Sequence, residues 1–171
     1  MHIRPLAPSD GAAFRLLRLE ALRLHPEAFG ASFAEASRTD AAGFAARLAA
    51  ARPPDAVFGA FDGDELAGMA GFAVRDGEKS RHKGLLWGVY VRADRRGRTF
   101  GRALVEHVIA HARSHVAALQ ATVVTTNTGA VALYRSLGFE TYGVERDALR
   151  VEGRSFDEAL IELRFDGGRA A

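Results

Sequence analysis

The stretch RRGRTFGRALVEH, residues 95–107, is the most informative part of the sequence for fold and function. It places several arginines and two glycines, Gly97 and Gly101, directly before a helical pattern. Glycines let a backbone approach a ligand closely, and the first N–H groups of a helix have no partner inside the helix. The helix dipole and the arginines both favour negative charge there. The segment therefore predicts an anion-binding loop at a helix start, with a solvated basic turn as the alternative.

Segments on both sides of this loop predict a mixed α/β fold with one sheet. KGLLWGVYV (83–91) is apolar on both faces, as expected for a central strand. Two earlier strands meet at the turn DGDE (62–65), which is a hairpin signal. After the helix come the strand ALQATVV (118–124), the short helix TGAVALYRSLG (128–138), and two strands that meet at VEGR (151–154). This order predicts one sheet covered by helices.

The N-terminal part adds a short strand and two helices. In the first helix, Phe14, Leu17, Ala21 and Leu24 recur at helical spacing, and Pro26 ends or bends it. A loop follows, and a second helix is expected before the paired prolines that close this part of the chain.

Composition narrows the classes of protein that the chain could be. Its 171 residues fit a single domain, 1–171, with one sizeable core. The absence of cysteine excludes disulfides, thiolate metal sites and a cysteine nucleophile. No run approaches the roughly 20 apolar residues of a membrane-spanning helix, and Arg4, Pro5 and Asp10 interrupt any signal peptide. We therefore expect a cytoplasmic protein with no membrane partner.

Two motifs in order resemble the GNAT superfamily of acyl-CoA-dependent N-acyltransferases. The Walker and GxGxxG nucleotide patterns are absent from the loop. The GNAT pyrophosphate loop, R/Q-x-x-G-x-G/A, falls instead on residues 96–101. The GNAT element Asn-x-x-Ala-x-x-Leu-Tyr, followed by Gly-Phe, falls on residues 127–139. The resemblance covers almost the whole chain and implies a mixed, mostly antiparallel sheet of about seven strands flanked by four helices.

The resemblance also implies a reaction. Acetyl-CoA would be the co-substrate, and its acetyl group would pass directly to a primary amine of a small molecule or peptide. Tyr134 matches the family's tyrosine that stabilises or protonates the departing thiolate. A splayed central strand, here Leu85 to Val91, supplies backbone donors in this family. The implied coenzyme-binding residues are Val89, Val91, Arg96, Gly97, Arg98, Thr99, Phe100, Gly101, Arg102 and Asn127. Alternatively, Tyr134 is an amphipathic residue on a helix face and Asn127 is a helix cap.

Thr99 stands where the family pattern has glycine. A threonine with positive φ would be strained by roughly 1–3 kcal/mol. We therefore predict a negative φ at Thr99, with helical or cap-like angles, and retained coenzyme binding.

The sequence leaves the proton acceptor for the amine open. Many relatives carry a glutamate on the central strand, but residues 83–91 contain no carboxylate. Either the base lies elsewhere, or the acceptor is an amine of low pKa, such as an α-amine, that needs little help. The candidate bases are Glu35, His82, Asp157 and Glu158.

Acceptor binding is predicted for the loop after the first helix and for the single tryptophan. The candidates are Phe29, Ser32, Phe33, Glu35 and Trp87. The aromatic residues among them are at least as consistent with core packing.

The remaining patterns in the sequence give weaker indications of function. His107, His111 and His115 line one helix face, but no carboxylate joins them, so we expect partly buried boundary residues and no metal. The densest basic patch consists of Arg92, Arg95, Arg96, Arg98 and Arg102. Coenzyme phosphates explain this patch, so no nucleic-acid partner is expected, and nucleic-acid binding is the weakest alternative.

The main alternative function is a non-catalytic acyl-CoA-binding regulatory module. The final hairpin could pair with a second copy, which allows a homodimer.

Overall fold

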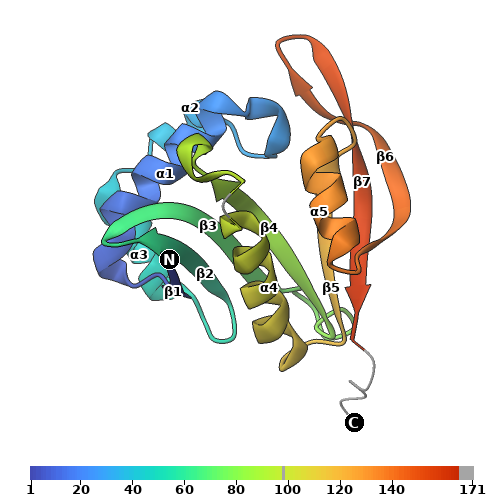
Figure 1. Cartoon of the computed structure of the whole chain (residues 1–171), viewed down its shortest axis with the longest axis horizontal. Helices are drawn as coiled ribbons and strands as arrows, with labels where there is room; N and C mark the ends of the chain where they lie inside the picture. The colour runs from blue at the N-terminus through green and yellow to red at the C-terminus, as the bar shows by residue number, and fades with distance from the viewer. Residues whose placement is uncertain (98, 166–171) are drawn as a thin grey trace.

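The computed structural model describes residues 1–97 and 99–165, and its strands form one seven-stranded sheet (Figure 1). The strands are β1 (His2–Pro5), β2 (Ala56–Asp62), β3 (Glu65–Val74), β4 (Lys83–Val91), β5 (Ala118–Val124), β6 (Glu140–Val151) and β7 (Arg154–Arg164). Their order in the sheet is β1-β2-β3-β4-β5-β7-β6, and only β4 and β5 pair in parallel. The predicted mixed, mostly antiparallel sheet is confirmed.

Helices cover both faces of the sheet (Figure 1). The α-helices are α1 (Gly11–Leu24), α2 (Phe33–Ser37), α3 (Ala41–Ala50), α4 (Phe100–Arg113) and α5 (Thr128–Ser136). The 3-10 helices are η1 (Pro8–Asp10), η2 (Pro26–Ala28) and η3 (Ala93–Arg95). One helix more than the predicted four is present because α2 forms in the segment expected to be a loop. Ser32 and Glu35 close a capping box at its start, which stabilises this single short helix.

Two hydrophobic clusters lie on opposite faces of the sheet. Along β3, Met69 packs with α1 and α3, whereas the next residue, Ala70, packs in the cluster that contains α4 residues. This alternation follows from the two-residue period of a strand. Leu104 of α4 is fully buried in one cluster, and Phe14 of α1 is 5 % exposed in the other. Among the described residues, no helix is both long and apolar enough to cross a bilayer.

The sheet opens between its two parallel strands. β4 and β5 pair only from Lys83 and Ala118 as far as Leu85 and Gln120. Beyond that point the two strands diverge, as Figure 1 shows. Gly88 lies in the opened part of β4 with φ of 64°, a backbone angle that favours glycine. The predicted splay of Leu85 to Val91 is therefore present, and it creates a wedge-shaped gap in the middle of the sheet.

Candidate functional site

Three neighbouring cavities surround the gap between β4 and β5. The loop cavity, of about 680 Å³, lies between the ends of β4 and β5, η2, the loop before α4, and the start of α5. The wedge cavity, of about 310 Å³, lies in the gap itself and is lined by Gly88, Tyr134 and Glu158. The apolar cavity, of about 450 Å³, lies between β2, β3, α1 and α3. Phe29, Val89 and Asn127 line both the loop and wedge cavities, so these two are continuous.

Most of the predicted coenzyme-binding residues come together in the loop cavity. Those that line it are Val89, Val91, Arg96, Gly97, Thr99, Gly101, Arg102 and Asn127. The side chain of Phe100 packs in the core and is 6 % exposed, which leaves its backbone N–H as the group that could reach a ligand. Arg98 lies outside the described residues.

The predicted negative φ at Thr99 is wrong. Thr99 is the N-cap residue of α4 and has φ of 67° and ψ of −8°, which is the left-handed region. Gly97, two residues earlier, also has a positive φ, of 74°. The chain must turn sharply here to lead from η3 into α4, and the turn requires left-handed angles whichever residue occupies the position. Thr99 therefore carries backbone strain of about 1–3 kcal/mol that glycine would avoid.

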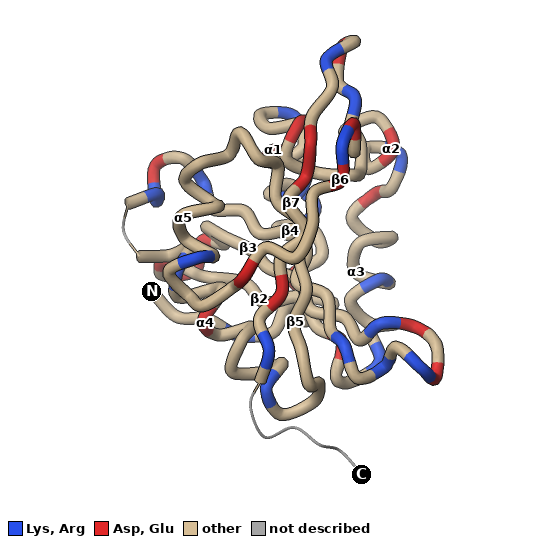
Figure 2. Tube along the Cα trace, turned by 90° about the vertical axis from the view of Figure 1, so that its right-hand side faces the viewer, with Lys and Arg blue, Asp and Glu red and all other residues tan. Residues whose placement is uncertain are grey.

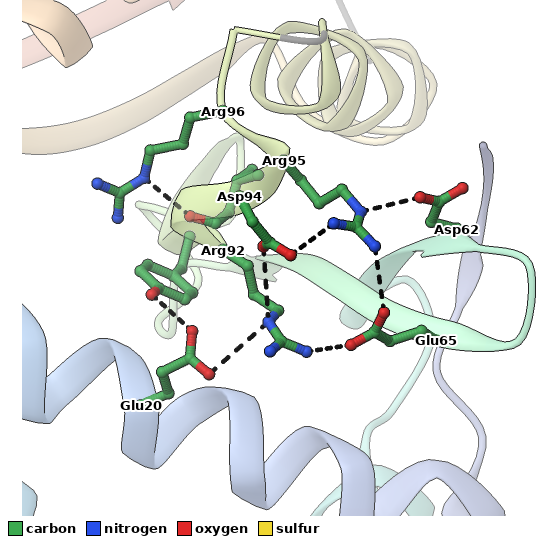
Figure 3. A network of polar contacts seen from close by, with 9 residues as sticks. Glu20, Asp62, Glu65, Arg92, Asp94, Arg95 and Arg96 are labelled. Carbon is green, nitrogen blue, oxygen red and sulfur yellow. Dashed lines mark hydrogen bonds and ion pairs between the residues drawn. The ribbon is translucent and has the colours of Figure 1, made fainter.

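Two of the arginines predicted in the basic patch are neutralised within the fold (Figure 3). Arg95 forms ion pairs with Asp62, Glu65 and Asp94, the first at 2.8 Å. Arg92 pairs with Glu65 and lies 3.8 Å from Glu20. Asp62 and Glu65 flank the β2–β3 turn, so this network fixes η3 against that hairpin. The turn residues are thus engaged in a structural ion-pair network.

Arg96 and Arg102 line the loop cavity. Arg96 points away from the acidic network in Figure 3, and its Nε donates to the carbonyl of Val91 at 3.0 Å. Arg102, in the first turn of α4, donates to Ser136 at 2.6 Å and pairs with Glu106 at 3.2 Å on the helix surface. The dipole of α4 and the guanidinium of Arg96 therefore favour negative charge next to the first amides of the helix, with Arg102 nearby.

Tyr134 and Asn127 line the wedge cavity from α5. Tyr134 is 7 % exposed and packs edge-on against Phe139 at 5.5 Å. Burial raises the pKa of its hydroxyl to about 12, so it is a neutral hydrogen-bond donor at physiological pH. Asn127 caps α5, since its side-chain oxygen accepts from the N–H of Ala130 at 3.2 Å. Its side-chain NH₂ group remains a donor for a ligand.

The predicted acceptor residues divide into two groups. Phe29 and Trp87 line the wedge cavity, and Trp87 and Glu35 line the apolar cavity. Ser32 and Phe33 line neither of these two cavities. Ser32 serves as the N-cap of α2, and Phe33 is 42 % exposed.

Of the four candidate bases, only Glu158 lines the wedge cavity together with Tyr134. Glu158 lines the wedge cavity and accepts a hydrogen bond from Thr122 at 3.0 Å. Glu35 accepts from Ser32 in the capping box, and Asp157 accepts the N–H of Asp147. His82 directly precedes the paired end of β4, opposite to the gap.

Sequence reasoning missed Arg18, which lines both the wedge and apolar cavities. Its signal was present in the pattern of α1. Arg18 lies four residues after Phe14 and four before Leu22, both of which are buried. A charged residue in the middle of an apolar helix face is unusual and indicates a special role.

His107 and His111 of α4 behave as expected for boundary residues, whereas the expectation is wrong for His115, which lies beyond the end of the helix. His107 and His111 are half-buried and pack edge-on against Phe58, at 4.9 and 5.2 Å, whereas His115 is exposed. Burial lowers the pKa of His107. In residues 1–97 and 99–165, no group of three or more histidine, aspartate or glutamate side chains could hold a metal ion.

Comparison with known proteins connects this geometry to one family. Residues 18–139 match the model of the acetyltransferase (GNAT) family. The chain is 35 % identical over 86 residues to the L-methionine sulfoximine/L-methionine sulfone acetyltransferase of Pseudomonas aeruginosa, which is 48 % of this chain and 49 % of that protein. It is 36 % identical over 118 residues to N-alpha-acetyltransferase RimI of Mycobacterium tuberculosis, 69 % of this chain and 70 % of that protein. The match thus spans about half the length of the first relative.

Solved structures share the fold over nearly the whole chain. The structure of yncA from Salmonella typhimurium with its cofactor acetyl-CoA superposes with a TM-score of 0.86, at 24 % identity, over 99 % of this chain and 96 % of that chain. The ribosomal-protein-alanine N-acetyltransferase of Brucella melitensis gives a TM-score of 0.80, also at 24 % identity, over 96 % of this chain and 100 % of that chain.

Proposed function

Because the chain belongs to the GNAT acetyltransferase family, we propose that it is an N-acetyltransferase that uses acetyl-CoA to acetylate a primary amine. The amine belongs to a small molecule or a peptide, and it attacks directly while both substrates are bound. One observation carries the proposal: the loop cavity continues into the wedge cavity at Val89 and Asn127. A carrier held at the start of α4 therefore reaches the buried hydroxyl of Tyr134.

The loop cavity fits the diphosphate and the arm of acetyl-CoA. The first amides of α4, with Arg96 and Arg102, would hold the diphosphate. Gly97 leaves open space, since a Cβ there would have no atom within 4 Å. Val89, Val91 and Asn127 would hold the arm along the opened edge of β4. The coenzyme supplies the acetyl group as a thioester.

Tyr134 would act on the departing sulfur. As the new N–C bond forms and the C–S bond breaks, negative charge develops on sulfur, and a neutral donor in a buried site stabilises it. A thiol has a pKa of about 8.5, well below that of Tyr134 at about 12. Tyr134 therefore contributes mainly by donating a hydrogen bond, and full proton transfer to the sulfur is uphill.

Glu158 is the side chain that would take the proton from the amine, directly or through water. Its carboxylate lines the same cavity as Tyr134. The other alternative, a low-pKa α-amine that needs no base, gains support from the relative named for N-alpha acetylation. Both alternatives place the amine in the wedge cavity.

Release of free thiol from acetyl-CoA tests the proposal. A panel of amino acids, polyamines, aminoglycosides and peptides should contain at least one acceptor that produces thiol in proportion to enzyme. A non-catalytic regulatory module would bind acetyl-CoA in calorimetry but release thiol with no acceptor on the panel. That result would remove the proposed activity and retain the coenzyme site.

The proposal also covers the location of the enzyme and its partners. We expect it to act in the cytoplasm as a homodimer joined through β6, the edge strand whose Tyr142 and Val144 are each 55 % exposed. Basic and acidic residues are interspersed over the view in Figure 2, including β6 and β7, which supports the absence of a nucleic-acid partner. Light scattering of the protein and of Val144→Lys tests the dimer, since the charge would separate the two edges.

A further inference from the structure

Arg18 is half-buried, and one nitrogen of its guanidinium group is fully buried at the point where the sheet opens. It projects from α1 and stacks over the ring of Phe29 at 4.9 Å. Its Nη1 atom is buried and has no hydrogen-bond partner among the described residues. A Cβ built on Gly88 would lie 3.5 Å from this atom, so the guanidinium sits against the opened part of β4.

An unpaired buried cation is costly, and it requires an explanation. Burial lowers the pKa of Arg18, yet an arginine stays protonated at neutral pH. Three carboxylates line the same two cavities, but each bonds to a neighbour of its own: Glu35 accepts from Ser32, Asp55 accepts the N–H of Val74 at 2.8 Å, and Glu158 accepts from Thr122. Within the described residues none of them forms an ion pair with Arg18, which leaves its guanidinium without a paired anion in a cavity open to ligands.

We propose that Arg18 binds the carboxylate of the acceptor, and that the acceptor is a free amino acid with an apolar side chain. This inference rests on the proposed acetyltransferase function and specifies its substrate class. Arginine recognises carboxylates through paired N–H donors, and such charge-assisted hydrogen bonds are strong where water is excluded.

The two cavities that meet at Arg18 suit the other parts of an amino acid. The wedge cavity holds Tyr134 and Glu158, so it would receive the amine. The apolar cavity, entered past Arg18 and Trp87, is lined largely by apolar side chains such as Phe44 and Leu48 and would receive the substrate's side chain. A cationic polyamine or aminoglycoside would place further positive charge beside Arg18, which is unfavourable.

Arg18 would also help to deprotonate the amine. In a free amino acid the neighbouring carboxylate stabilises the ammonium form and so raises the pKa of the amine. A guanidinium paired with that carboxylate cancels its charge and lowers the pKa of the amine. The same contact therefore selects the substrate and increases the fraction of neutral amine.

The test compares acids with matched amides in enzymes with and without the guanidinium. The acceptors are L-leucine, L-methionine and L-phenylalanine, each beside its amide. The variants are Arg18→Gln and Arg23→Gln, the latter being an exposed arginine of the same helix. The wild type should prefer at least one acid over its amide by about 100-fold in kcat/KM, which is about 2.7 kcal/mol. Arg18→Gln should reduce that preference to a few-fold, and Arg23→Gln should keep it. The KM for acetyl-CoA should stay constant.

Two results would overturn the inference. Amides could be as good as acids in the wild type, or Arg18→Gln could slow acids and amides equally, as expected if Arg18 acted on the thioester instead. Removal of an unpaired buried charge should leave the melting temperature of Arg18→Gln equal to or above that of the wild type. A melting temperature in that range would exclude unfolding as the cause of a loss of activity.

A binding measurement separates this inference from the proposed activity. Trp87, the single tryptophan, lines both cavities, so its fluorescence should report acceptor binding in the presence of coenzyme A. If no acceptor releases thiol, the acetyltransferase function fails. A saturable change with the acids that is lost in Arg18→Gln would still establish the carboxylate site. No change with any of the acids would remove the site.

Discussion

The two sides of the gap between β4 and β5 are built differently. On the side of α4, one continuous stretch from Val89 to Arg102 supplies the basic wall of the loop cavity, and ion pairs of Arg92 and Arg95 fix η3 just before the loop. On the α1 side, the cavities are assembled from α1, η2, α2, α3 and the middle of β4, and the guanidinium of Arg18 lacks a partner for Nη1 within the described residues.

This difference separates what a family shares from what an individual member recognises. A donor used by every member requires a fixed geometry, which a short local motif and its ion pairs supply. An acceptor that differs between members requires a surface that can change, and distant segments with few mutual constraints can change independently. The α4 side should therefore govern coenzyme affinity and the α1 side acceptor choice.

The largest effect is expected where the two sides meet, at Tyr134. Tyr134→Phe removes the hydroxyl and keeps the ring that packs on Phe139. Loss of a donor to developing charge should lower kcat by about 100-fold or more, with acetyl-CoA affinity unchanged. Steady-state kinetics and calorimetry measure the two quantities. Tyr142→Phe, on the exposed edge strand, serves as the control. An unchanged kcat in Tyr134→Phe would leave the tyrosine as a packing residue only.

A smaller, pH-dependent effect is expected for Glu158→Gln. Without the carboxylate, kcat/KM at pH 7 should fall by about tenfold or more, and the loss should shrink toward pH 9 as more amine is neutral in solution. Glu78→Gln is the matched control, because Glu78 is exposed in the turn between β3 and β4. If the pH–rate profile of Glu158→Gln matches that of the wild type, the acceptor needs no base from this residue.

Variants of two neighbouring arginines, Arg95 and Arg96, separate stability from coenzyme binding on the side of α4. Arg96→Gln removes a cation from the loop cavity and should weaken acetyl-CoA binding by about tenfold, or about 1.4 kcal/mol. Arg95→Gln removes a partner of Asp62 and Glu65, so it should lower the melting temperature slightly and leave the affinity nearly constant. Calorimetry and thermal unfolding distinguish the two variants. Equal losses of affinity would show that the ion-pair network itself shapes the coenzyme site.

The sequence predicted the fold, and most of its coenzyme-binding candidates lie around one cavity, because these signals are local. Strand 83–91, the loop and α4 follow one another without interruption, so spacing alone places them together. The same holds for Asn127 and Tyr134, one at the start of α5 and one within it.

The α1 side could not be predicted in the same way. Ser32 and Phe33 stand in the expected segment, and the local Ser-x-x-Glu pattern of 32–35 does indicate α2, but which cavity the residues of α2 line depends on how that helix packs. Arg18 and Glu158 lie far apart in the sequence and share a cavity because β7 pairs with β5, beside the gap. Such proximity depends on the topology of the sheet and on where its pairing stops, which no local pattern encodes.

The smallest effect is expected at Thr99, where the local signal itself was misleading. The prediction of a negative φ assumed that the type of residue at position 99 determines its backbone angle, whereas the turn into α4 fixes φ at 67°. Thr99→Gly should relieve that strain and partly offset the gain through the greater entropy of unfolded glycine. The net gain of about 1 kcal/mol corresponds to a rise of about 2–4 °C in melting temperature.

Coenzyme affinity should change little in Thr99→Gly, because the turn is already formed in the wild type. Thermal unfolding and calorimetry with acetyl-CoA measure both consequences. A hundredfold gain in affinity would instead mean that threonine impairs the loop and that the α4 side is less rigid than its ion pairs indicate. An unchanged or lower melting temperature would mean that contacts of the threonine side chain outweigh the backbone strain.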